Sequence, residues 1–410
     1  MTGVGKMTKL LAYRTVFNFP PALSISRNNL IFHNNRLYLN EIPKIRNYAT
    51  EAKSSFQKQG KRTMFMIFAL CGTAAAGFEL YNRYLNYNRK SQLQAIVSIR
   101  ETYENVEMPD TKATKQVIGT NMEFANVHLK MFQYQSCPFC CKVRAYIEYN
   151  GLNCDVVEVN PVFRTETKNF IYKKVPIIFC NIEEQTKQLN DSSLIISVLH
   201  SFMKKAKDRD IDSVLQCYPP VTFKNEKGKL VTESQNKYSV MYDNEILSEE
   251  QLASVKEEKK WRKWTDDWLV HLLSPNIYRT RKEALQAFDS FSEVGEWENN
   301  FSTFSRYIVI YVGAAAMYFI GKRLKKKYNL KEDVRESLYD ACREWTRAIG
   351  NKRKFMGGDK PNLADLAVYG VLNSIEGCNA FEDVLQNTKI KKWYYETKKA
   401  VKEHLGCQNV

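Results

Sequence analysis

A pair of cysteines with CxxC spacing stands between two segments of different periodicity. Residues 127–134 (VHLKMFQY) place apolar side chains at every second position, as a half-buried β-strand does. Residues 138–150 (PFCCKVRAYIEYN) place them at helical spacing before Gly151. Cys137 and Cys140 are therefore expected where a strand gives way to a helix, and this placement favours a reactive site.

The predicted position of Cys137 favours its thiolate form. Unpaired amide groups and the positive dipole end of the helix lower a thiol pKa below the ~8.5 of free cysteine. Pro138 suits the first helical turn because it has no N–H to leave unsatisfied, and Lys142 and Arg144 add positive charge nearby. Cys140 shares the helical face of Cys137, where it can resolve a mixed disulfide. Zinc is not expected, since the sequence has no second CxxC or CxxxH pair.

Cysteine spacing and charge argue against two other classes of protein. Ten cysteines in 410 residues, unevenly spaced and without a secretory cleavage pattern, indicate free thiols in a reducing compartment and not a disulfide framework. The net charge of +16 arises in part from residues 1–50, which hold seven Lys or Arg and one acidic residue. The remaining charge lies on helices of mixed sign without a nucleic-acid fold signature, so no nucleic-acid partner is expected.

The N-terminal region is predicted to carry a targeting signal and an anchor. Residues 1–50 have the composition of an organellar transit peptide, with cleavage expected near Tyr48 or Ala49. Residues 61–80 are predicted to form a single transmembrane anchor, although their apolar run is short for ~30 Å of hydrocarbon. The alternatives are an unprocessed basic arm and a buried or interfacial helix. Similar positive charge on both sides leaves the orientation undetermined.

These signals predict a membrane-associated, single-pass protein of mitochondria. A Golgi membrane location with a released cytoplasmic form is the alternative. A second apolar run at 307–320 (YIVIYVGAAAMYFI) is predicted to be a central core helix, because it has only 14 residues and lies among amphipathic helices. Membrane contact through its basic end at 322–327 is the alternative reading.

The order of elements predicts a thioredoxin-like α/β domain followed by helices. A spacer is expected at 82–126, and the α/β domain at 127–205. Within that domain we expect strands at 127–134, 154–159, 176–180 and 186–189, and helices at 138–150, near 163–173 and at 192–203. A linker is expected at 206–242 and an all-helical domain at 243–406.

Sequence patterns predict two helices of the second domain. Residues 257–273 are predicted to form one amphipathic helix, in which Trp261, Trp264 and Trp268 recur at three and four residues and form a core stripe. Asn362 is expected to cap a later helix, with Asp365 reaching back three positions on. The second signal is a folding device and not a catalytic one.

Three short motifs carry a family resemblance. They are Tyr134-x-x-Cys137-Pro138-Phe139-Cys140, Lys174-Val175-Pro176 and Asn190-Asp191-Ser192-Ser193. In this order and spacing they resemble the glutaredoxin and glutathione transferase superfamily, and within it the type-2 family of membrane-associated prostaglandin E synthases. The resemblance implies a glutaredoxin-type domain, an all-α glutathione-transferase-like C-terminal domain and an N-terminal membrane helix.

The resemblance also implies a glutathione site. Val175, before a cis-Pro176, is expected to bind the cysteine portion of glutathione through its backbone. Asp191 and Ser192 open the next helix, where they are expected to take the γ-glutamyl group. Phe139 is expected to contribute to this site and to line the apolar side of a lipid groove.

The activity that the resemblance implies is isomerisation of prostaglandin H2 to prostaglandin E2. Cys137 would be the nucleophile, Tyr134 would hold the thiolate or a nascent oxyanion, and Cys140 would be the third site residue. Haem bound through Cys137 beside glutathione, and a homodimer, are further implications. Two alternatives stand: a glutaredoxin-like thiol-disulfide oxidoreductase that uses both thiols, and a non-enzymatic, membrane-anchored scaffold. Tyr134 could equally be a strand-end aromatic without a chemical role.

Overall fold

The computed structural model describes residues 104–182, 185–204, 210–224, 228, 230–241 and 247–407. The predicted targeting segment at 1–50, the predicted anchor at 61–80 and residues 82–103 of the predicted spacer lie outside these residues.

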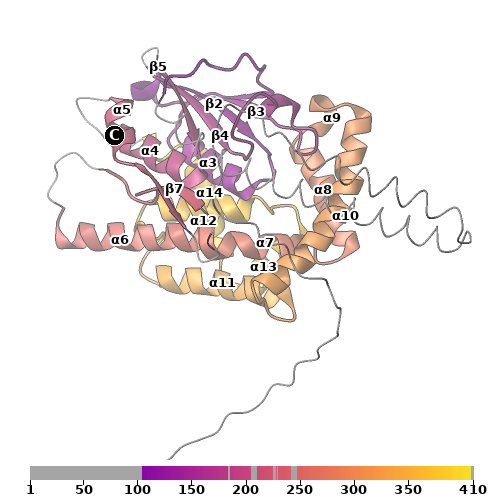
Figure 1. Cartoon of the computed structure of the whole chain (residues 1–410). Coiled ribbons are helices and arrows are strands. Elements are labelled where there is room, and N and C mark those ends of the chain that lie inside the picture. The colour runs from indigo at the N-terminus through magenta and orange to yellow at the C-terminus, as the bar shows by residue number, and fades with distance from the viewer. Residues whose placement is uncertain are drawn as a thin grey trace, which may run out of the picture. The chain divides into compact units, whose positions relative to one another are not determined.

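A mixed five-stranded sheet, drawn in purple and magenta in Figure 1, has the strand order β1-β3-β2-β4-β5. Only β2 and β3 run parallel, with Leu129 opposite Cys154, and the other neighbours are antiparallel. The strands are β1 (Lys115–Val117), β2 (His128–Gln133), β3 (Cys154–Glu158), β4 (Ile177–Ile182) and β5 (Gln185–Asn190). The four strands predicted from the sequence are confirmed as β2 to β5.

Helix α3 (Pro138–Tyr149) makes the crossover that a parallel pair such as β2 and β3 requires. Helix α4 (Ser192–Lys204) follows β5. Both helices lie between the sheet and the helical domain in Figure 1. The βαβ–ββα order predicted from the sequence is therefore the observed one.

Alternation along β2 separates two apolar faces of the sheet. Leu129 and Met131 belong to the large core that also includes α3 and α4, whereas Phe132 belongs to a second cluster. In that cluster Phe132 packs edge-on against Phe170, with 4.8 Å between ring centroids. Both faces of the sheet are therefore covered, which explains why β2 is buried on each side.

The C-terminal part of the chain is helical. Its helices are α6 (Glu249–Trp264), α7 (Val270–Ile277), α8 (Arg281–Val294), α9 (Trp297–Asn300), α10 (Thr303–Lys327), α11 (Val334–Ile349), α12 (Leu363–Asn373), α13 (Asn379–Asn387) and α14 (Lys391–Lys402). A π-helical turn, Thr265–Leu269, joins α6 to α7.

The structure contains both features predicted for this domain, the capped helix at Asn362 and the tryptophan-bearing helix, but the second has different bounds. Asn362 and Asp365 form a capping box at the start of α12, as predicted. Trp261 is buried and packs edge-on against Trp264 and against Trp345 of α11. The single helix predicted at 257–273 is instead α6, the π-helical turn and α7, so its bounds were wrong.

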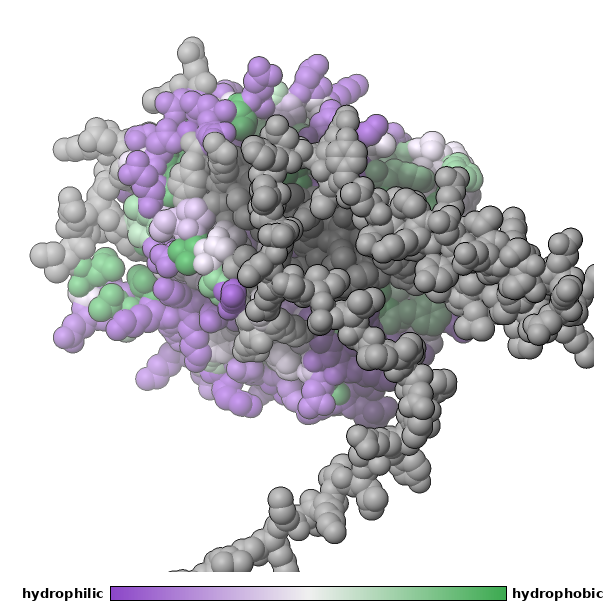
Figure 2. All heavy atoms as spheres, in the orientation of Figure 1, coloured by the Kyte–Doolittle hydropathy of each residue, from purple (hydrophilic) through white to green (hydrophobic). Residues whose placement is uncertain are grey.

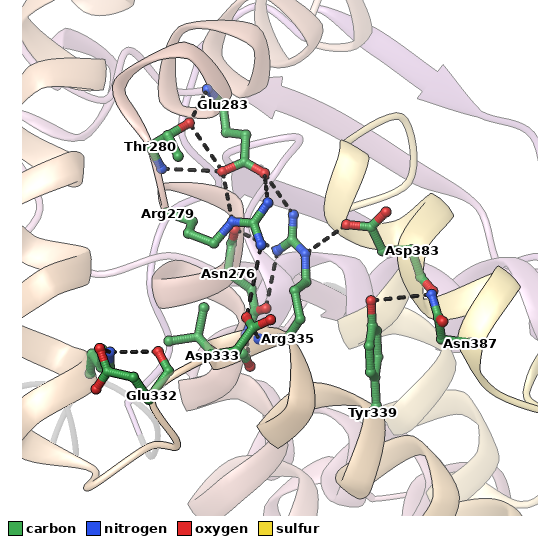
Figure 3. A network of polar contacts seen from close by, with 12 residues as sticks. Asn276, Arg279, Thr280, Glu283, Glu332, Asp333, Arg335, Tyr339, Asp383 and Asn387 are labelled. Carbon is green, nitrogen blue, oxygen red and sulfur yellow. Dashed lines mark hydrogen bonds and ion pairs between the residues drawn. The ribbon is translucent and has the colours of Figure 1, made fainter.

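A buried arginine joins four helical segments (Figure 3). Arg335 at the start of α11 donates to Glu283 of α8 at 2.9 Å, to Asp383 of α13 at 2.8 Å and to the carbonyl oxygen of Asn276 in α7 at 2.7 Å. Because each partner is an acceptor, the guanidinium is paired although it is almost completely buried.

Three segments differ from the prediction. The expected spacer contributes β1, which adds a strand to the edge of the sheet beside β3. The expected linker contains α5 (Ile211–Gln216) and a hairpin of β6 (Pro220–Lys224) and β7 (Leu230–Ser234). The helical stretch expected near 163–173 is only a short 3-10 turn, Thr165–Thr167.

The prediction that residues 307–320 form a central core helix is wrong. They lie in α10, which has 25 residues and is long and apolar enough to cross a membrane by length and composition. Only 28% of its most apolar window is buried, so α10 is a surface helix with one packed side. Fourteen apolar residues suggested burial, but the helix continues beyond both ends of that run.

Helix α12 lies very close to α3. A Cβ atom built on Gly370 would be 2.6 Å from the Cα of Lys142 and 2.8 Å from the carbonyl carbon of Cys141. Glycine has no Cβ, so the two backbones can approach this far. This contact joins the helical domain directly to the helix that carries the thiols.

Candidate active site

Cys137 occupies the N-cap position of α3, immediately after β2. Its backbone is extended, Pro138 follows at the first helical position, and the Cys137 amide donates to the carbonyl of Tyr134 at 3.0 Å. The Cys137 side chain is half-buried and makes no capping hydrogen bond, whereas Cys140 is completely buried. The strand-to-helix corner predicted from the sequence is therefore present, with one thiol accessible and one enclosed.

The two thiols have opposite ionisation tendencies. A hydrogen bond from the Cys140 thiol lowers the pKa of Cys137, helped by the Cys140 and Phe139 amides and the charge of Arg144, while burial opposes them. Burial raises the pKa of Cys140 well above its usual range, and its hydrogen bond to Cys137 raises it further. Cys137 is thus the thiolate of the pair, and Cys140 stabilises it as a donor.

Tyr134 directly follows β2, next to the dithiol. Burial raises the pKa of the Tyr134 hydroxyl, the charge and hydrogen bond of Arg164 lower it, and Cys137 and Cys140 raise it. The net increase keeps Tyr134 protonated at neutral pH, so it can donate a hydrogen bond. Arg164, in the loop after β3, had no sequence signal that tied it to this site.

The peptide bond between Val175 and Pro176 is cis, as the resemblance implied. Pro176 is buried and Val175 is half-buried just before β4. Val175 packs against both apolar clusters of the sheet. The Val175 backbone is thereby held just before the first residue of β4, the strand that pairs with β2.

Asp191 opens α4 with its carboxylate acting as the cap. One oxygen accepts from the Ser193 amide at 2.9 Å, and the other lies 3.3 Å from the Lys237 ammonium. The Asp191 backbone has φ 72°, in the left-handed region, and Ser192 is buried beside it. Negative and positive groups therefore stand together at a helix N-terminus, where an amino acid's carboxylate and ammonium can both be bound.

Tyr172 lies near both this corner and the dithiol. Burial raises the pKa of its hydroxyl, and the charges of Asp191, Cys140 and Cys137 raise it further. Since such charges act at short range, Tyr172 lies within reach of both parts of the site. The aromatic residue was missed because nothing in its sequence neighbourhood distinguishes it from a core position.

Lys142 does not support the thiolate as expected. Its ammonium forms an ion pair with Asp266 of the π-helical turn and donates to Ser193 at 2.9 Å. Burial alone would raise the pKa of Asp266, but Lys142 and hydrogen bonds from Ser193 and Tyr238 lower it. Of the two basic residues predicted near the thiol, only Arg144 contributes to the shift at Cys137.

Buried polar groups hold the turn between Tyr134 and Cys137. The Gln135 amide donates to Glu158 at 2.7 Å, and Arg144 donates to the Gln135 carbonyl at 2.7 Å and to the Cys141 sulfur at 2.9 Å. Burial raises the pKa of Glu158 to about 7, although the Gln135 amide and Arg144 oppose this. In the part of the chain that the structure describes, no group of three or more His, Cys, Asp or Glu could hold a metal ion.

Comparisons with known proteins agree with this arrangement. Residues 131–202 match the model of the glutathione S-transferase N-terminal domain. The chain is 50% identical over 279 residues to prostaglandin E synthase 2 of Danio rerio, covering 67% of this chain and 71% of that protein. The chain belongs to the prostaglandin E synthase 2 family. The Mus musculus protein of the same name is 47% identical over 289 residues, 70% of this chain and 73% of its own.

Solved structures of glutathione transferases are also similar to this chain. Human glutathione transferase theta-2, in a complex with glutathione, is 12% identical with a TM-score of 0.37, over 67% of this chain and 82% of that one. The matched residues 131–202 contain every predicted site residue, from Tyr134 to Ser192.

Proposed function

We propose that the chain is a prostaglandin E synthase, an isomerase that converts prostaglandin H2 to prostaglandin E2 and binds glutathione. Family membership supports the activity. One observation supports a single-thiol mechanism: Cys137 is half-buried with a lowered pKa, whereas Cys140 is buried with a raised pKa. An isomerisation without net redox change needs one thiolate that is regenerated at each turnover.

The proposed reaction begins with attack of the Cys137 thiolate on the endoperoxide oxygen attached to carbon 9. A sulfur–oxygen bond forms, the oxygen–oxygen bond breaks, and the carbon 11 oxygen leaves with the electron pair and takes a proton. A base then removes the hydrogen from carbon 9. Its electrons form the ketone as the sulfur–oxygen bond breaks, which returns the thiolate.

Tyr134 has the properties of the proton donor in this scheme. Its raised pKa keeps the hydroxyl protonated at neutral pH, and Arg164 is its hydrogen-bonding partner. A protonated hydroxyl beside Cys137 can stabilise the alkoxide that leaves carbon 11. Tyr134→Phe is therefore expected to lower kcat more than it changes KM.

A glutaredoxin-like thiol-disulfide oxidoreductase is the second candidate. The hydrogen bond between the Cys140 and Cys137 thiols favours it, because a resolving thiol must reach the first sulfur. The buried position of Cys140 is less favourable to exchange with a protein substrate.

Three serine variants separate these activities. An isomerase loses endoperoxide conversion in Cys137→Ser and keeps most of it in Cys140→Ser, while a dithiol reductase loses disulfide reduction in both. Cys141→Ser is the matched control, because Cys141 is a neighbouring buried thiol with its pKa raised by burial to about 11. Failure of the wild-type protein to convert the endoperoxide with added thiol would contradict the synthase and favour a scaffold.

The glutathione site is proposed at Val175, Asp191 and Ser192. The cis peptide before Pro176 presents the Val175 backbone, as the resemblance implies for the cysteine portion of glutathione. The Asp191 carboxylate suits the γ-glutamyl ammonium, and the Lys237 ammonium 3.3 Å from it suits the carboxylate.

Calorimetric titration with glutathione tests this site. Asp191→Asn and Lys237→Met are each expected to weaken binding about tenfold or more, the scale of one charge-assisted hydrogen bond. Lys259→Met is the control, since Lys259 is exposed and donates to Ser239 instead. Phe139 contacts the Lys142 ammonium across 5.7 Å and is expected to affect lipid substrate more than glutathione.

Haem is a further ligand proposed for Cys137. The donor chemistry fits, because Cys137 is a half-buried thiol with a lowered pKa and thiolate is a known haem-iron ligand. Haem there would occupy the sulfur that the isomerisation needs. An absorbance titration tests it: a Soret shift with the wild type should be absent in Cys137→Ser.

We also propose the location predicted from the sequence. Residues 61–80 would anchor the protein in a membrane and residues 1–50 would direct it to mitochondria, with a Golgi membrane and a released cytoplasmic form as the alternative. Both segments lie outside the described residues. Deletion of each segment followed by imaging and carbonate extraction tests the proposal, and light scattering in detergent tests the homodimer that the family resemblance implies.

A further inference from the structure

One side of α10 is an uninterrupted apolar surface. Its exposed residues recur at three- and four-residue intervals, so they share one face of the helix. We define the α10 face as Phe304, Tyr307, Tyr311, Val312, Ala315, Ala316, Phe319 and Ile320. From Phe304 to Ile320 the face is about 24 Å long at 1.5 Å per residue.

The exposure of this face is unusually large for apolar side chains. Phe304 is 74% exposed, Phe319 is 65% exposed and Val312 is 60% exposed. Figure 2 shows hydrophobic atoms in green at this end of the molecule, on either side of the grey residues. Soluble surfaces rarely expose so many large apolar residues together, so the face is expected to contact a partner.

The other side of α10 is packed on the protein, which argues against a helix that crosses a membrane. Gly313 lies so close to Phe288 of α8 that a Cβ atom there would be 2.4 Å from the ring. Gly321 lies against α7, where a Cβ atom would be 3.2 Å from the Ser274 carbonyl oxygen. A helix held along its length by its own domain can lie on a membrane surface with one face inserted.

The charged side chains of α10 and of the residues next to it at 299–331 have one sign. Residues 299–331 contain seven Lys or Arg and no Asp or Glu. Arg306, Lys325 and Lys331 are paired with Glu298, Glu332 and Asp340. Among the described contacts of the chain, the remaining four basic residues form no ion pair: Lys322, Arg323, Lys326 and Lys327.

This charge distribution distinguishes between two partners for the α10 face, a second copy of the chain and an anionic lipid bilayer. A second copy that packed its own α10 face here would bring positive charge and no carboxylate from residues 299–331, so like charges would meet. Anionic lipid headgroups would pair with the four basic side chains that form no described ion pair, while aromatic and aliphatic residues enter the acyl boundary. Complementary charge therefore favours lipid.

The first turn of α10 is next to a loop of the candidate active site. Ser305, in the first turn of α10, accepts a 2.7 Å hydrogen bond from the Asn160 side chain. Asn160 caps the turn that carries Val162 and Phe163, which are 47% and 51% exposed. Arg164, the partner of Tyr134, follows directly.

We propose that the α10 face docks on an anionic lipid bilayer, with α10 lying in the plane of the interface and its basic C-terminal turn on the headgroups. This contact is separate from the anchor proposed at 61–80. It holds the helical domain against the membrane and brings the turn at Val162 and Phe163, beside the thiol site, to the lipid surface.

Photocrosslinking of the full chain tests this contact. The protein with Phe319→p-benzoylphenylalanine is reconstituted in vesicles of phosphatidylcholine and phosphatidylglycerol, irradiated, and its adducts are identified by mass spectrometry. The expected product at position 319 is a phospholipid adduct. Tyr395→p-benzoylphenylalanine is the matched control, because Tyr395 is an exposed aromatic residue on α14 and should give no lipid adduct.

Charge variants make the test specific for anionic lipid. Lys322→Glu, Lys326→Glu and Lys327→Glu combined should reduce the lipid adduct at 319 by roughly threefold or more, given the attraction of each lysine to an anionic surface. Lys389→Glu, Lys391→Glu and Lys392→Glu combined, on exposed positions just before and at the start of α14, should leave it unchanged. Thermal unfolding of both variants checks the fold.

Several outcomes would overturn the proposal. A crosslink from 319 to another copy of the chain would make the α10 face a dimer interface, and a crosslink within the same chain would make it an internal contact. Absence of any adduct at 319, or equal lipid adducts in both charge variants, would also refute docking on anionic lipid.

Discussion

Lys142 on α3 and Asp266 in the π-helical turn form a buried ion pair that joins the thiol-bearing helix to the helical domain. Ser193 and Tyr238 donate to the same carboxylate at 2.6 and 3.1 Å. The pair therefore connects the start of α4, where glutathione is proposed to bind, with both domains.

Removing Lys142 should destabilise the protein strongly. Lys142→Met leaves Asp266 buried without its cation, and breaking such a pair costs about 3–5 kcal/mol of unfolding free energy. The double variant Lys142→Met with Asp266→Leu should recover much of this loss, because no uncompensated charge remains. Urea denaturation measures both, and a single-variant loss below about 1 kcal/mol would contradict the assignment.

Cys140 should control the reactivity of Cys137 through its hydrogen bond. Cys140→Ala removes the largest cause of the lowered pKa, so the pKa of Cys137 should rise and alkylation by iodoacetamide at neutral pH should slow. Cys140→Ser keeps a donor at the same place and should stay close to wild type. The pH profile of the alkylation rate is the measurement, and identical profiles for all three proteins would refute the role of the bond.

Glu158 should make stability depend on pH. Its pKa is raised by burial to about 7, so the protonated form favours the folded state. The stability that it contributes is complete below about pH 4.5 and is lost as pH rises through 7. Glu158→Gln should therefore gain stability relative to wild type between pH 5 and pH 8, by up to roughly 3 kcal/mol. Denaturation at the two pH values tests this, and a pH-independent difference would contradict it.

Arg335 should be essential to the helical domain and irrelevant to thiol chemistry. Arg335→Met leaves Glu283 and Asp383 without their buried partner and is expected to cost about 3–5 kcal/mol. Arg343→Met is the control, since Arg343 is exposed and its ion pairs are worth less than about 1 kcal/mol. The alkylation rate of Cys137 in folded protein should be unchanged in both variants.

Local signals in the sequence were sufficient for the thiol corner and for the capped helix. The alternation before Cys137, Pro138 at the first helical position, and the Asn362–Asp365 pair each act within a few residues. Such patterns determine backbone geometry without long-range contacts. The predicted strands of the α/β domain and its helices at 138–150 and 192–203 were accordingly found close to their expected bounds, whereas the helix expected near 163–173 was not.

Contacts between side chains that are far apart in the sequence could not be predicted from it. Lys142 was expected to support the thiolate. Its ammonium instead forms an ion pair with Asp266, which lies 124 residues away in the sequence. Arg164, Tyr172 and Lys237 come to the site from loops whose paths depend on the packing of other elements. The burial of α10 was also misjudged, because an apolar run has the same composition whether it faces a core or another partner.

The missing side chain at Gly370 has a consequence for how this architecture can change. The thiol corner is specified by residues near 137, yet the distance of α3 from its support is set by a position without any functional group. A methyl group at 370 would act as a wedge between the two helices and would displace the start of α3. Neither half of the protein could therefore be exchanged for that of a related transferase unless this glycine, or an equivalent gap, came with it.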